Sequence, residues 1–460
     1  MKNKILFTVC FLFFLNLLSA QKYDYNWIIG YVKNVYDGSI LNRKNIIHFN
    51  DKTIDYISGL SSIKSKMSAY NLTASDSMGN LIFYFNGLKI YNADNKVMTG
   101  GDSIGYFLKP ISWDYDNSHD FPLLVDDSGG SIRNYTQKFI PFPGHSDQYL
   151  MFCTHYTDSL YEAQTILSRI IYARIDMTLS GGKGAVVEKN KLLIHGHMTG
   201  IGLVKHANGR DWWLVTSPIG SNIFYVYLIS PVGITGPEKQ IVGPKSGHER
   251  NIKSGGAISY HSNYDQFSPD GKTYVKILES SLMLYDFNRC TGELSFRKEV
   301  SDFPKSFHNI AFSPDSRFIY SVYSGNLYQL DLKDSTNRSM LIAPLVQHVY
   351  LQLAPDERIY FSYDKTKYMG YINRPNQKGL ACDVRNFVIN TPVEKSIILP
   401  QFPNYRLRAE ENINCPEQDS IFLPFGEPHL YKVQGKEYTG SDRYKMIDDT
   451  SWKDLFKVDN

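Results

Sequence analysis

A turn motif recurs at a nearly constant spacing in this chain of 460 residues. The segment FSPDG (267–271) recurs as FSPDS 45 residues later (312–316), and as LAPDE 41 residues after that (353–357). A second marker keeps the same register, because Asp286 and Asp331 each follow the aspartate of their turn by 16 residues. A turn signal with a fixed period marks an array of similar supersecondary units rather than a single core.

The residues of each motif favour a tight turn followed by a strand. Proline presets φ for the second position of a type I turn, and the aspartate side chain can accept hydrogen bonds from nearby amides. Gly271 suits the next position, where φ is positive, whereas Ser316 and Glu357 replace it in the later copies, so we expect looser turns there. Each motif precedes a short apolar run, at residues 274–277, 318–321 and 359–362.

Looser copies of the unit precede the regular ones. Turn signals at residues 77–80, 146–148 and 207–210 each lead into an apolar run, at spacings of about 60 to 70 residues. Six units with several short strands each predict an all-β fold, a β-propeller of seven blades, with six or eight as alternatives. Asp270, Asp315 and Asp356 should then occupy equivalent corners of three successive blades.

The ends of the array are consistent with a closed ring. Residues 45–49 and 53–57 form a strand–turn–strand pattern before the first unit, and residues 396–399 follow the last one. A blade closed by strands from both termini would leave no open sheet edge.

Composition agrees with strands and excludes some partners. Aromatic residues make up 14% of the chain, with 33 Tyr and 26 Phe, and aromatic side chains pack well on pleated surfaces. The 49 basic and 46 acidic residues are well mixed, so there is no electrostatic footprint of a nucleic-acid-binding protein.

The first twenty residues have the pattern of a secretory signal peptide. Lys2 and Lys4 precede the apolar run 5–18, and Ser19-Ala20 before Gln21 provides a small-residue cleavage site. A run of fourteen residues is too short for a membrane anchor, which needs roughly 20. We therefore expect a signal peptide at 1–20, a propeller at 21–410 and a tail at 411–460, with export to the periplasm or the medium.

Four cysteines remain after cleavage: Cys153, Cys290, Cys382 and Cys415. They allow three disulfide connectivities and lack the CxxC spacing of a zinc cluster. Our hypothesis pairs Cys382 with Cys415, which would pin the C-terminal stretch to the last blade.

Several stretches resemble a family of secreted propellers. They are residues 71–98, KHANGRDWWLVT (205–216), NIFYVYLIS (222–230), YDFNRCTGEL (285–294) and PNYRL (403–407). Together they resemble the WD40-like or YVTN-like propeller proteins abundant in Bacteroidota, over about residues 24–408. The resemblance implies an exported propeller. Members of this family often carry a C-terminal sorting domain read by the type IX secretion system, but residues 431–460 lack its β-sandwich pattern.

Candidate chemistry is sparse. His195 and His197 form an HxH pair that could share one face of a strand and hold a metal, but no third ligand is recognisable nearby. His206 could line the channel, although a histidine beside a turn more often bonds the backbone. We predict no metal, cofactor or catalytic residue from these patterns.

Three further patterns favour structural roles. SGGKGA (180–185) lacks the hydroxyl residue that follows the lysine of a phosphate-binding loop, so it is interpreted as a hairpin loop. No GxSxG element presents a nucleophilic serine. Trp212 and Trp213 are adjacent on a strand, so at most one could face a ligand, and core packing is expected for both.

Two classes of function remain open from the sequence. The favoured one is a non-enzymatic exported propeller that binds a protein, glycan or envelope component through the loops at one end of its channel. The alternative is a lactonase-like propeller hydrolase with polar residues converging in the channel, since a fold alone does not determine function.

Overall fold

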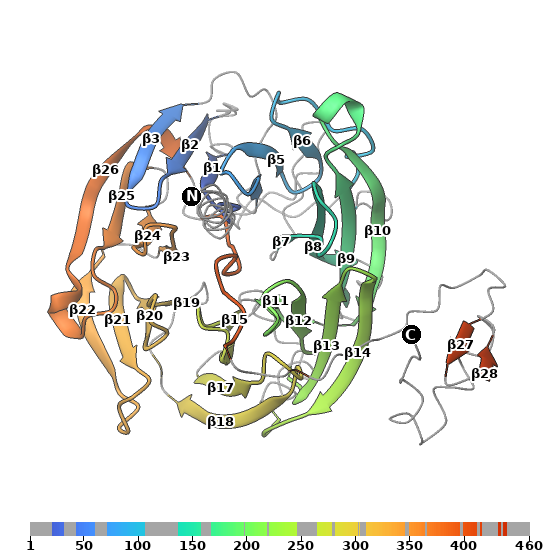
Figure 1. Ribbon diagram of the computed structural model, residues 1–460. Helices are drawn as coiled ribbons and strands as arrows, with labels where there is room; N and C mark the ends of the chain where they lie inside the picture. Colours follow the sequence, from blue (N-terminus) through green and yellow to red (C-terminus); the bar gives the residue numbers. More distant parts are fainter. Residues whose placement is uncertain are drawn as a thin grey trace, which may run out of the picture.

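The described strands form a ring of sheets around a central axis (Figure 1). The computed structural model describes residues 21–31, 43–59, 71–105, 137–157, 167–196, 198–218, 220–245, 265–277, 281–301, 303, 310–345, 349–363, 366–395, 399–411, 415, 431–433 and 436–438. The signal segment 1–20 and His197 lie outside these residues. Seven sheets make up the ring, which confirms the prediction of a seven-bladed β-propeller.

Each blade is an antiparallel sheet of consecutive strands. Blades 1 and 2 have three described strands each: β1 (Asn26–Tyr31), β2 (Arg43–Phe49) and β3 (Ile54–Gly59), then β4 (Leu72–Ser75), β5 (Leu81–Phe85) and β6 (Ile90–Asn92). Blades 3 and 4 have four each: β7 (Gln137–Pro141), β8 (Gln148–Thr157), β9 (Leu167–Asp176) and β10 (Ala185–His195), then β11 (Gly202–Lys205), β12 (Trp212–Thr216), β13 (Ile223–Ser230) and β14 (Gly233–Ile241).

The last three blades also have four strands each. Blade 5 contains β15 (Gln266–Phe267), β16 (Thr273–Ile277), β17 (Ser281–Phe287) and β18 (Leu294–Ser301). Blade 6 contains β19 (Ile310–Phe312), β20 (Phe318–Tyr323), β21 (Asn326–Asp331) and β22 (Ser339–Pro344). Blade 7 contains β23 (Tyr350–Leu353), β24 (Ile359–Ser362), β25 (Thr366–Ile372) and β26 (Val384–Lys395).

The other regular structure in the described part of the chain consists of short pieces. Two 3₁₀ turns, η2 (Ser180–Gly182) and η3 (Gly379–Cys382), connect outer strands, and β27 (Tyr431–Val433) pairs with β28 (Lys436–Tyr438). No helix in the described part of the chain is long and apolar enough to cross a membrane.

The three regular turns occupy equivalent places, as predicted. Asp270, Asp315 and Asp356 each lie in the turn between the first and second strands of blades 5, 6 and 7. In each turn an oxygen of the aspartate accepts a hydrogen bond from the amide two residues later, at 3.0, 3.1 and 3.2 Å respectively. The looser upstream copies also fall between the first and second strands of blades 2, 3 and 4.

The expectation that the later turns are looser is wrong. Gly271, Ser316 and Glu357 have φ of 73°, 61° and 65°, so all three adopt the left-handed conformation. Their amides donate to the carbonyl three residues earlier at 2.8, 2.9 and 3.1 Å. Serine and glutamate therefore keep the turn geometry and bear the conformational cost that glycine avoids.

The hydrophobic core lies between neighbouring blades rather than at one centre. Trp212 packs in a cluster shared by blades 2, 3 and 4, whereas Trp213 packs in the cluster between blades 4 and 5. Both indoles are buried, because adjacent residues of β12 point to opposite faces of the sheet. The prediction that both tryptophans serve core packing is confirmed.

In blade 1 the described strands come from the N-terminal part of the chain, and part of the C-terminal segment packs beside them. Strand β1 begins beside the turn between β4 and β5, since the Lys22 amide donates to the Ser77 carbonyl at 3.2 Å. Strand β1 therefore runs in the same direction as the second strands of the other blades. The innermost position of blade 1, which a first strand would occupy, has no described strand. Leu399 and Phe402 pack against Trp27 at that position, but residues 399–402 are not paired as a strand, and 396–398 lie outside the described residues.

Blades 1 and 7 also meet at the rim. The Asn45 side chain of β2 donates to the carbonyl of Val393 in β26 at 2.9 Å and accepts from the Val393 amide at 3.1 Å. These two bonds join residues from opposite ends of the propeller and hold the first blade against the last.

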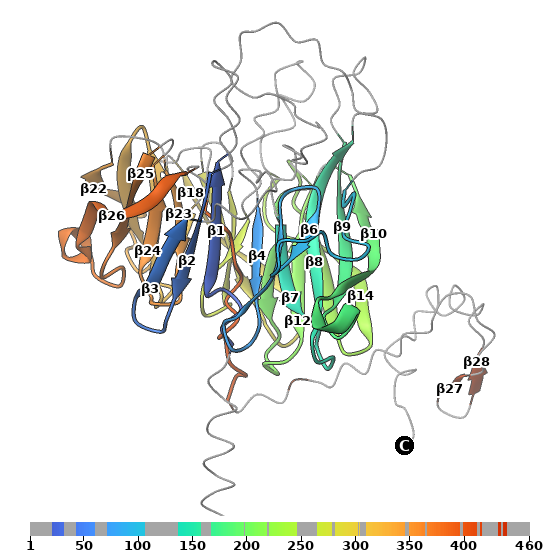
Figure 2. The same cartoon turned by 90° about the horizontal axis from the view of Figure 1, so that it is seen from above.

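The C-terminal strap, residues 399–411, runs through the middle of the ring toward one of its faces (Figures 1 and 2). Tyr405 is fully buried, and its hydroxyl donates to the carbonyl of Phe139 at 2.7 Å. The Arg406 guanidinium makes two bonds to the Asp24 carboxylate, at 2.7 and 2.8 Å. The Glu410 amide donates to the Ala207 carbonyl at 2.8 Å. The strap thus covers the face that carries the first turns of the blades.

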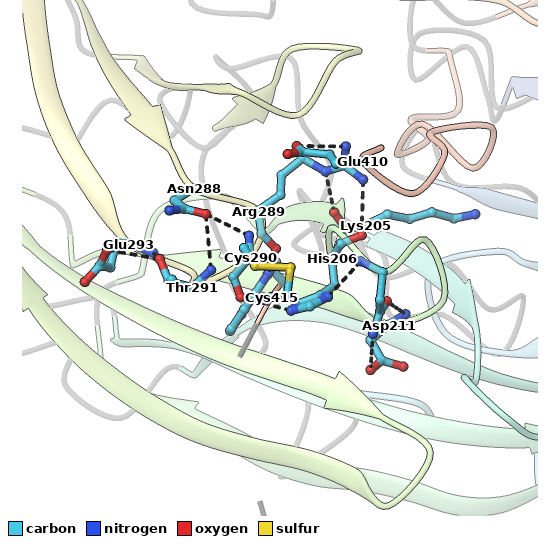
Figure 3. Close-up of a disulfide and its surroundings, with 12 residues drawn as sticks. Lys205, His206, Asp211, Asn288, Arg289, Cys290, Thr291, Glu293, Glu410 and Cys415 are labelled. Carbon is cyan, nitrogen blue, oxygen red and sulfur yellow. Dashed lines mark hydrogen bonds and ion pairs between the residues drawn. A yellow bond between two sulfur atoms is a disulfide. The ribbon is translucent and has the colours of Figure 1, made fainter. Parts of the chain in front are cut away.

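A disulfide joins Cys290 to Cys415, just beyond the strap (Figure 3). The predicted pairing of Cys382 with Cys415 is wrong, because Cys382 and Cys153 are buried free cysteines. Cys382 packs in the core between blades 6 and 7, whereas the strap carries the chain across the ring to blade 5. The Cα atoms of the bonded pair lie 5.2 Å apart, although 125 residues separate them in sequence.

We expect Cys415→Ser to lower the free energy of unfolding by roughly 2 to 5 kcal/mol, because the bond closes a long loop in the unfolded chain. Denaturant unfolding with and without reductant measures this effect. Mass mapping of non-reduced peptides should recover Cys290 linked to Cys415, and recovery of a Cys382–Cys415 peptide would contradict the structure.

Candidate functional site

His195, the described member of the HxH pair, lies away from the channel. His195 ends β10, the outermost strand of blade 3, and its side chain is exposed. His197 falls outside the described residues. Within the described part of the chain, no three histidine, cysteine, aspartate or glutamate side chains cluster as metal ligands would. Nothing described therefore brings further ligands to His195.

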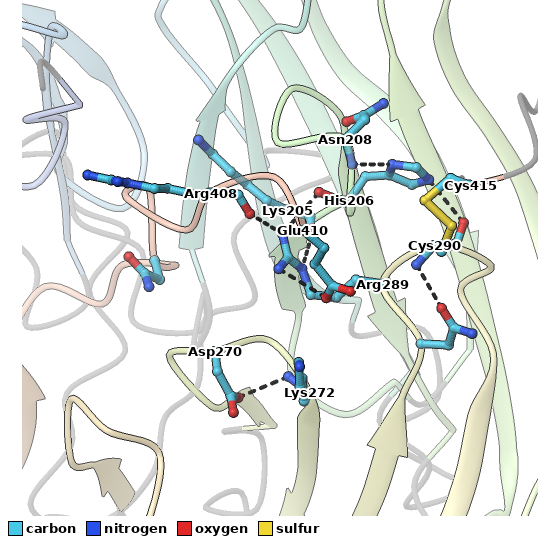
Figure 4. Close-up of polar contacts among 12 residues, drawn as sticks. Lys205, His206, Asn208, Asp270, Lys272, Arg289, Cys290, Arg408, Glu410 and Cys415 are labelled. Carbon is cyan, nitrogen blue, oxygen red and sulfur yellow. Dashed lines mark hydrogen bonds and ion pairs between the residues drawn. A yellow bond between two sulfur atoms is a disulfide. The ribbon is translucent and has the colours of Figure 1, made fainter. Parts of the chain in front are cut away.

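His206 has a structural role (Figure 4). Its Nε2 donates to the carbonyl of Cys290 at 3.0 Å, and its Nδ1 accepts from the amide of Asn208 at 3.0 Å. Both ring nitrogens are thus used in the neutral form, and burial lowers the pKa of His206. The interpretation of His206 as a histidine that bonds the backbone is the one the geometry supports.

Arg289 organises the covered face and was missed by the sequence analysis. Its side chain is buried and donates to the carbonyls of Lys205 (2.9 Å), His206 (3.1 Å) and Arg408 (2.8 Å). It also pairs with Glu410 at 3.2 Å (Figure 4). One guanidinium therefore links blade 4, blade 5 and the strap, and it leaves little capacity for a ligand.

The SGGKGA segment is a connection between outer strands, as interpreted from the sequence. It forms η2 and then enters β10, and the Lys183 ammonium pairs with Asp94 at 2.7 Å. Gly181 and Gly182 are exposed, and Gly184 packs against Met98 and Met177, so the segment lies at an outer blade edge and contributes nothing to the channel.

The described residues do enclose a small polar cavity in the central channel. It is lined by inner-strand and adjacent residues of blades 3, 5, 6 and 7 and by the strap: Lys138, Asp265, Gln266, Ile310, Gln352, Gln401 and Phe402. The cavity admits a group of about the size of water rather than a whole ligand. This convergence of charged and amide side chains from distant blades is the candidate site.

Lys138 is the cation of this cavity. It lies on β7 with 6% of its surface exposed, and its ammonium has no hydrogen-bond partner among the described residues. Burial lowers the pKa of Lys138 to about 8, and the nearby Asp265 opposes that shift. A buried ammonium without hydrogen bonds is unfavourable unless a ligand or a counter-charge compensates it.

Asp265 is the carboxylate of the cavity, immediately before β15. Its Oδ2 accepts from the hydroxyls of Thr199 and Tyr274, the latter at 2.7 Å, whereas its buried Oδ1 has no partner among the described residues. Burial raises the pKa of Asp265, and the charge of Lys276 opposes the rise. Buried carboxyl groups with shifted pKa values are typical of functional sites.

Lys276 supports Asp265 from the second strand of blade 5. Its ammonium donates to the Ser217 hydroxyl at 2.7 Å and to the Ser221 carbonyl at 2.6 Å. Burial lowers the pKa of Lys276 to about 8, and Asp265 opposes the shift. Unlike Lys138, this lysine has its hydrogen bonds satisfied within the protein.

The two faces of the ring carry connections of different length. The first and second strands of a blade join at the strap face through short turns such as 313–317. Because the strands of a blade are antiparallel, the second strand ends at the opposite face, and so does the fourth. The strand ends at this opposite face include those of β1 and β2, which residues 32–42 separate in the sequence, and those of β14 and β15, which residues 242–265 separate. Long connections on a rigid scaffold commonly carry binding residues, so the face opposite the strap is the candidate binding face.

Comparisons with known proteins show similarity in fold alone. No family model matches the chain, and no curated protein matches it. A solved protein of unknown function from Desulfotomaculum acetoxidans is 12% identical, over 82% of this chain and 99% of its own, with a TM-score of 0.39. A candidate 6-phosphogluconolactonase from Bacteroides fragilis is 13% identical, over 83% and 98% of the two chains, with a TM-score of 0.43.

An oligogalacturonate lyase in complex with manganese is 12% identical, over 74% of this chain and 82% of its own, with a TM-score of 0.37. At these identities none of the three assigns a ligand or a reaction. The propeller is established by the sheet order of the chain itself.

We expect stability to rise with pH between about 8 and 10. The pKa values of Lys138, Lys205 and Lys276 are lowered from 10.5 to about 8 by burial, so in this window the unfolded chain holds more protons than the folded one. Above pH 10 the buried tyrosines, whose pKa values are raised, reverse the trend.

Urea unfolding at a series of pH values measures the slope of the unfolding free energy against pH. Lys138→Met should reduce it by up to about 1.4 kcal/mol per pH unit, whereas Lys191→Met, at an exposed position of β10, should not change it. A wild-type stability that falls between pH 8 and 9.5 would contradict the buried lysines.

Proposed function

We propose that this chain is an exported β-propeller that binds a glycan, protein or other envelope component at the face opposite the strap. The observation that carries the proposal is the closure of one end of the channel by residues 399–411, held by Tyr405 and Arg289. A ligand would then approach from the other face, where strands separated by long stretches of sequence, such as β14 and β15, end and begin.

Export is part of this proposal. The signal-peptide pattern at 1–20 and the resemblance to secreted propellers of Bacteroidota motivate it. The Cys290–Cys415 disulfide supports it, since disulfides persist mainly in oxidising compartments.

One observation favours the alternative, a propeller hydrolase. Lys138 and Asp265 are buried ionisable groups with shifted pKa values in the channel, where such an enzyme would place its site. Hydrolysis would also need an activated nucleophile or a second acid or base nearby. The other polar groups in the described lining are the amides of three glutamines, which favours binding.

Steric blocking of each face tests the binding proposal. Ser324, in the β20–β21 hairpin, is exposed on the face opposite the strap, and Lys272 is exposed on the strap face. Ser324→Cys and Lys272→Cys, each coupled to a bulky polyethylene glycol maleimide, form a matched pair, because the native free cysteines are buried.

We expect the wild-type protein to bind immobilised envelope polysaccharides or an envelope fraction, and the label at position 324 to weaken binding severalfold more than the label at 272. Binding is measured on a glycan array and by surface plasmon resonance. If only the label at position 272 weakened binding, the ligand would bind at the strap face, and the proposal would be overturned.

We also expect the mature protein to show no turnover on a panel of lactones and esters, and to keep its melting temperature after metal chelation. Turnover that disappears in Asp265→Asn would establish the hydrolase instead. Turnover that is sensitive to chelator and lost in His195→Ala or His197→Ala would point to the HxH pair.

A further inference from the structure

The cavity in the channel holds a cation, Lys138, whose ammonium is hydrogen-bonded by no described residue, although Asp265 lies nearby. Its described surroundings contain two buried ammonium groups, Lys138 and Lys276, and one buried carboxyl group, Asp265. Lys276 is satisfied by Ser217 and Ser221, and Asp265 is bonded by two hydroxyls. The charge of Lys138 remains without a hydrogen-bonded partner among the described residues.

Amide groups surround this ammonium from separate elements. Gln266 on β15 and Gln401 on the strap line the same cavity, and their side-chain amides have no hydrogen-bond partner among the described residues. The Gln352 Nε2 is already used, since it donates to the Leu353 carbonyl at 2.9 Å. One ammonium and two primary amides thus line one cavity and can donate hydrogen bonds to an acceptor bound in it.

We infer that this cavity binds a single monovalent anionic group, and that Lys138, Gln266 and Gln401 are the residues that contact it. The group is either the carboxylate of an acidic ligand or a small free anion such as chloride or formate. The water-sized space excludes sulfate and phosphate. A bound anion compensates the desolvation of the buried ammonium, as an ion pair with additional hydrogen bonds does.

Asp265 does not prevent anion binding. Its Oδ2 accepts from Thr199 and Tyr274, its Oδ1 has no partner among the described residues, and the two ammonium groups of Lys276 and Lys138 together exceed its single charge. When the source is a ligand carboxylate, the inference rests on the proposed function and deepens it, since it makes the ligand acidic and gives it an anchor inside the channel.

Anion titration of the mature protein tests the inference. The probes are sodium chloride, sodium formate and sodium glucuronate, each added at constant ionic strength set with sulfate, and the readouts are calorimetry and the melting temperature. We expect saturable binding of at least one probe, and a rise in melting temperature with it. Lys138→Met should weaken that affinity roughly tenfold or more, because it removes a charged hydrogen-bond donor.

Lys205→Met is the matched control. Lys205 is also a buried lysine of the inner strands, but its ammonium donates to Gln21 and lies 5.6 Å from the Trp212 ring centre, away from the cavity lining. Its substitution should leave the anion affinity unchanged. Equal affinity in the wild type and Lys138→Met, or no response to any of the three probes, would overturn the inference.

The pattern among the probes identifies the source. Binding of formate and glucuronate without competition from chloride indicates a ligand carboxylate, whereas chloride that competes with formate indicates a small free anion. Binding of neutral glycans without any anion response would retain the proposed function and reject the anion site.

A crystallographic measurement on the wild-type protein tests the site without relying on the folding of a variant. Crystals of the wild-type protein grown with bromide in place of chloride should show an anomalous peak within hydrogen-bond distance of the Lys138 Nζ. If the channel has no such peak in bromide crystals and no peak for formate in a parallel crystal, the site does not exist.

Discussion

Closure of the ring depends on the burial of Tyr405 at its centre. The seven sheets are separate hydrogen-bonded units, so the ring is held by side chains packed between neighbouring blades and by whatever joins the first blade to the last. Tyr405 packs with its ring centroid 5.3 Å from those of Tyr23 and Phe139 and 5.9 Å from that of Trp212. Its contacts therefore tie the N-terminal segment, blade 3 and blade 4 to the C-terminal strap, and they fix the position of Gln401 and Phe402 in the cavity wall.

The propeller could be predicted from the sequence because its signal is local. A turn with an aspartate that caps its own backbone and a residue at positive φ is encoded in five consecutive positions, and it repeats once per blade. Ser316 and Glu357 show that the period survives even where glycine is lost. Strand direction in blade 1 and the path of residues 399–411 could not be predicted, since neither follows a period.

The candidate site depends on contacts between residues far apart in sequence. Lys138 and Asp265 lie in blades 3 and 5, and Gln401 comes from the strap, so no spacing connects them. The disulfide was mispredicted for the same reason: Cys382 is closer to Cys415 in sequence, but the strap brings Cys415 to blade 5. A usable signal did exist, because Lys138 and Lys276 lie in short strands with apolar neighbours, and a lysine in a strand buried on both faces requires a specific environment.

The Cys290–Cys415 bond changes how mechanical load enters the molecule. A pull on the chain beyond Cys415 reaches blade 5 directly through the sulfur atoms, and the 125-residue span that contains blades 6 and 7 forms a covalent loop outside the line of force. These two blades and the strap are thereby shielded from stretching. If the tail is tethered to a surface, shear would load blades 1 to 5 and leave the covered face of the channel intact.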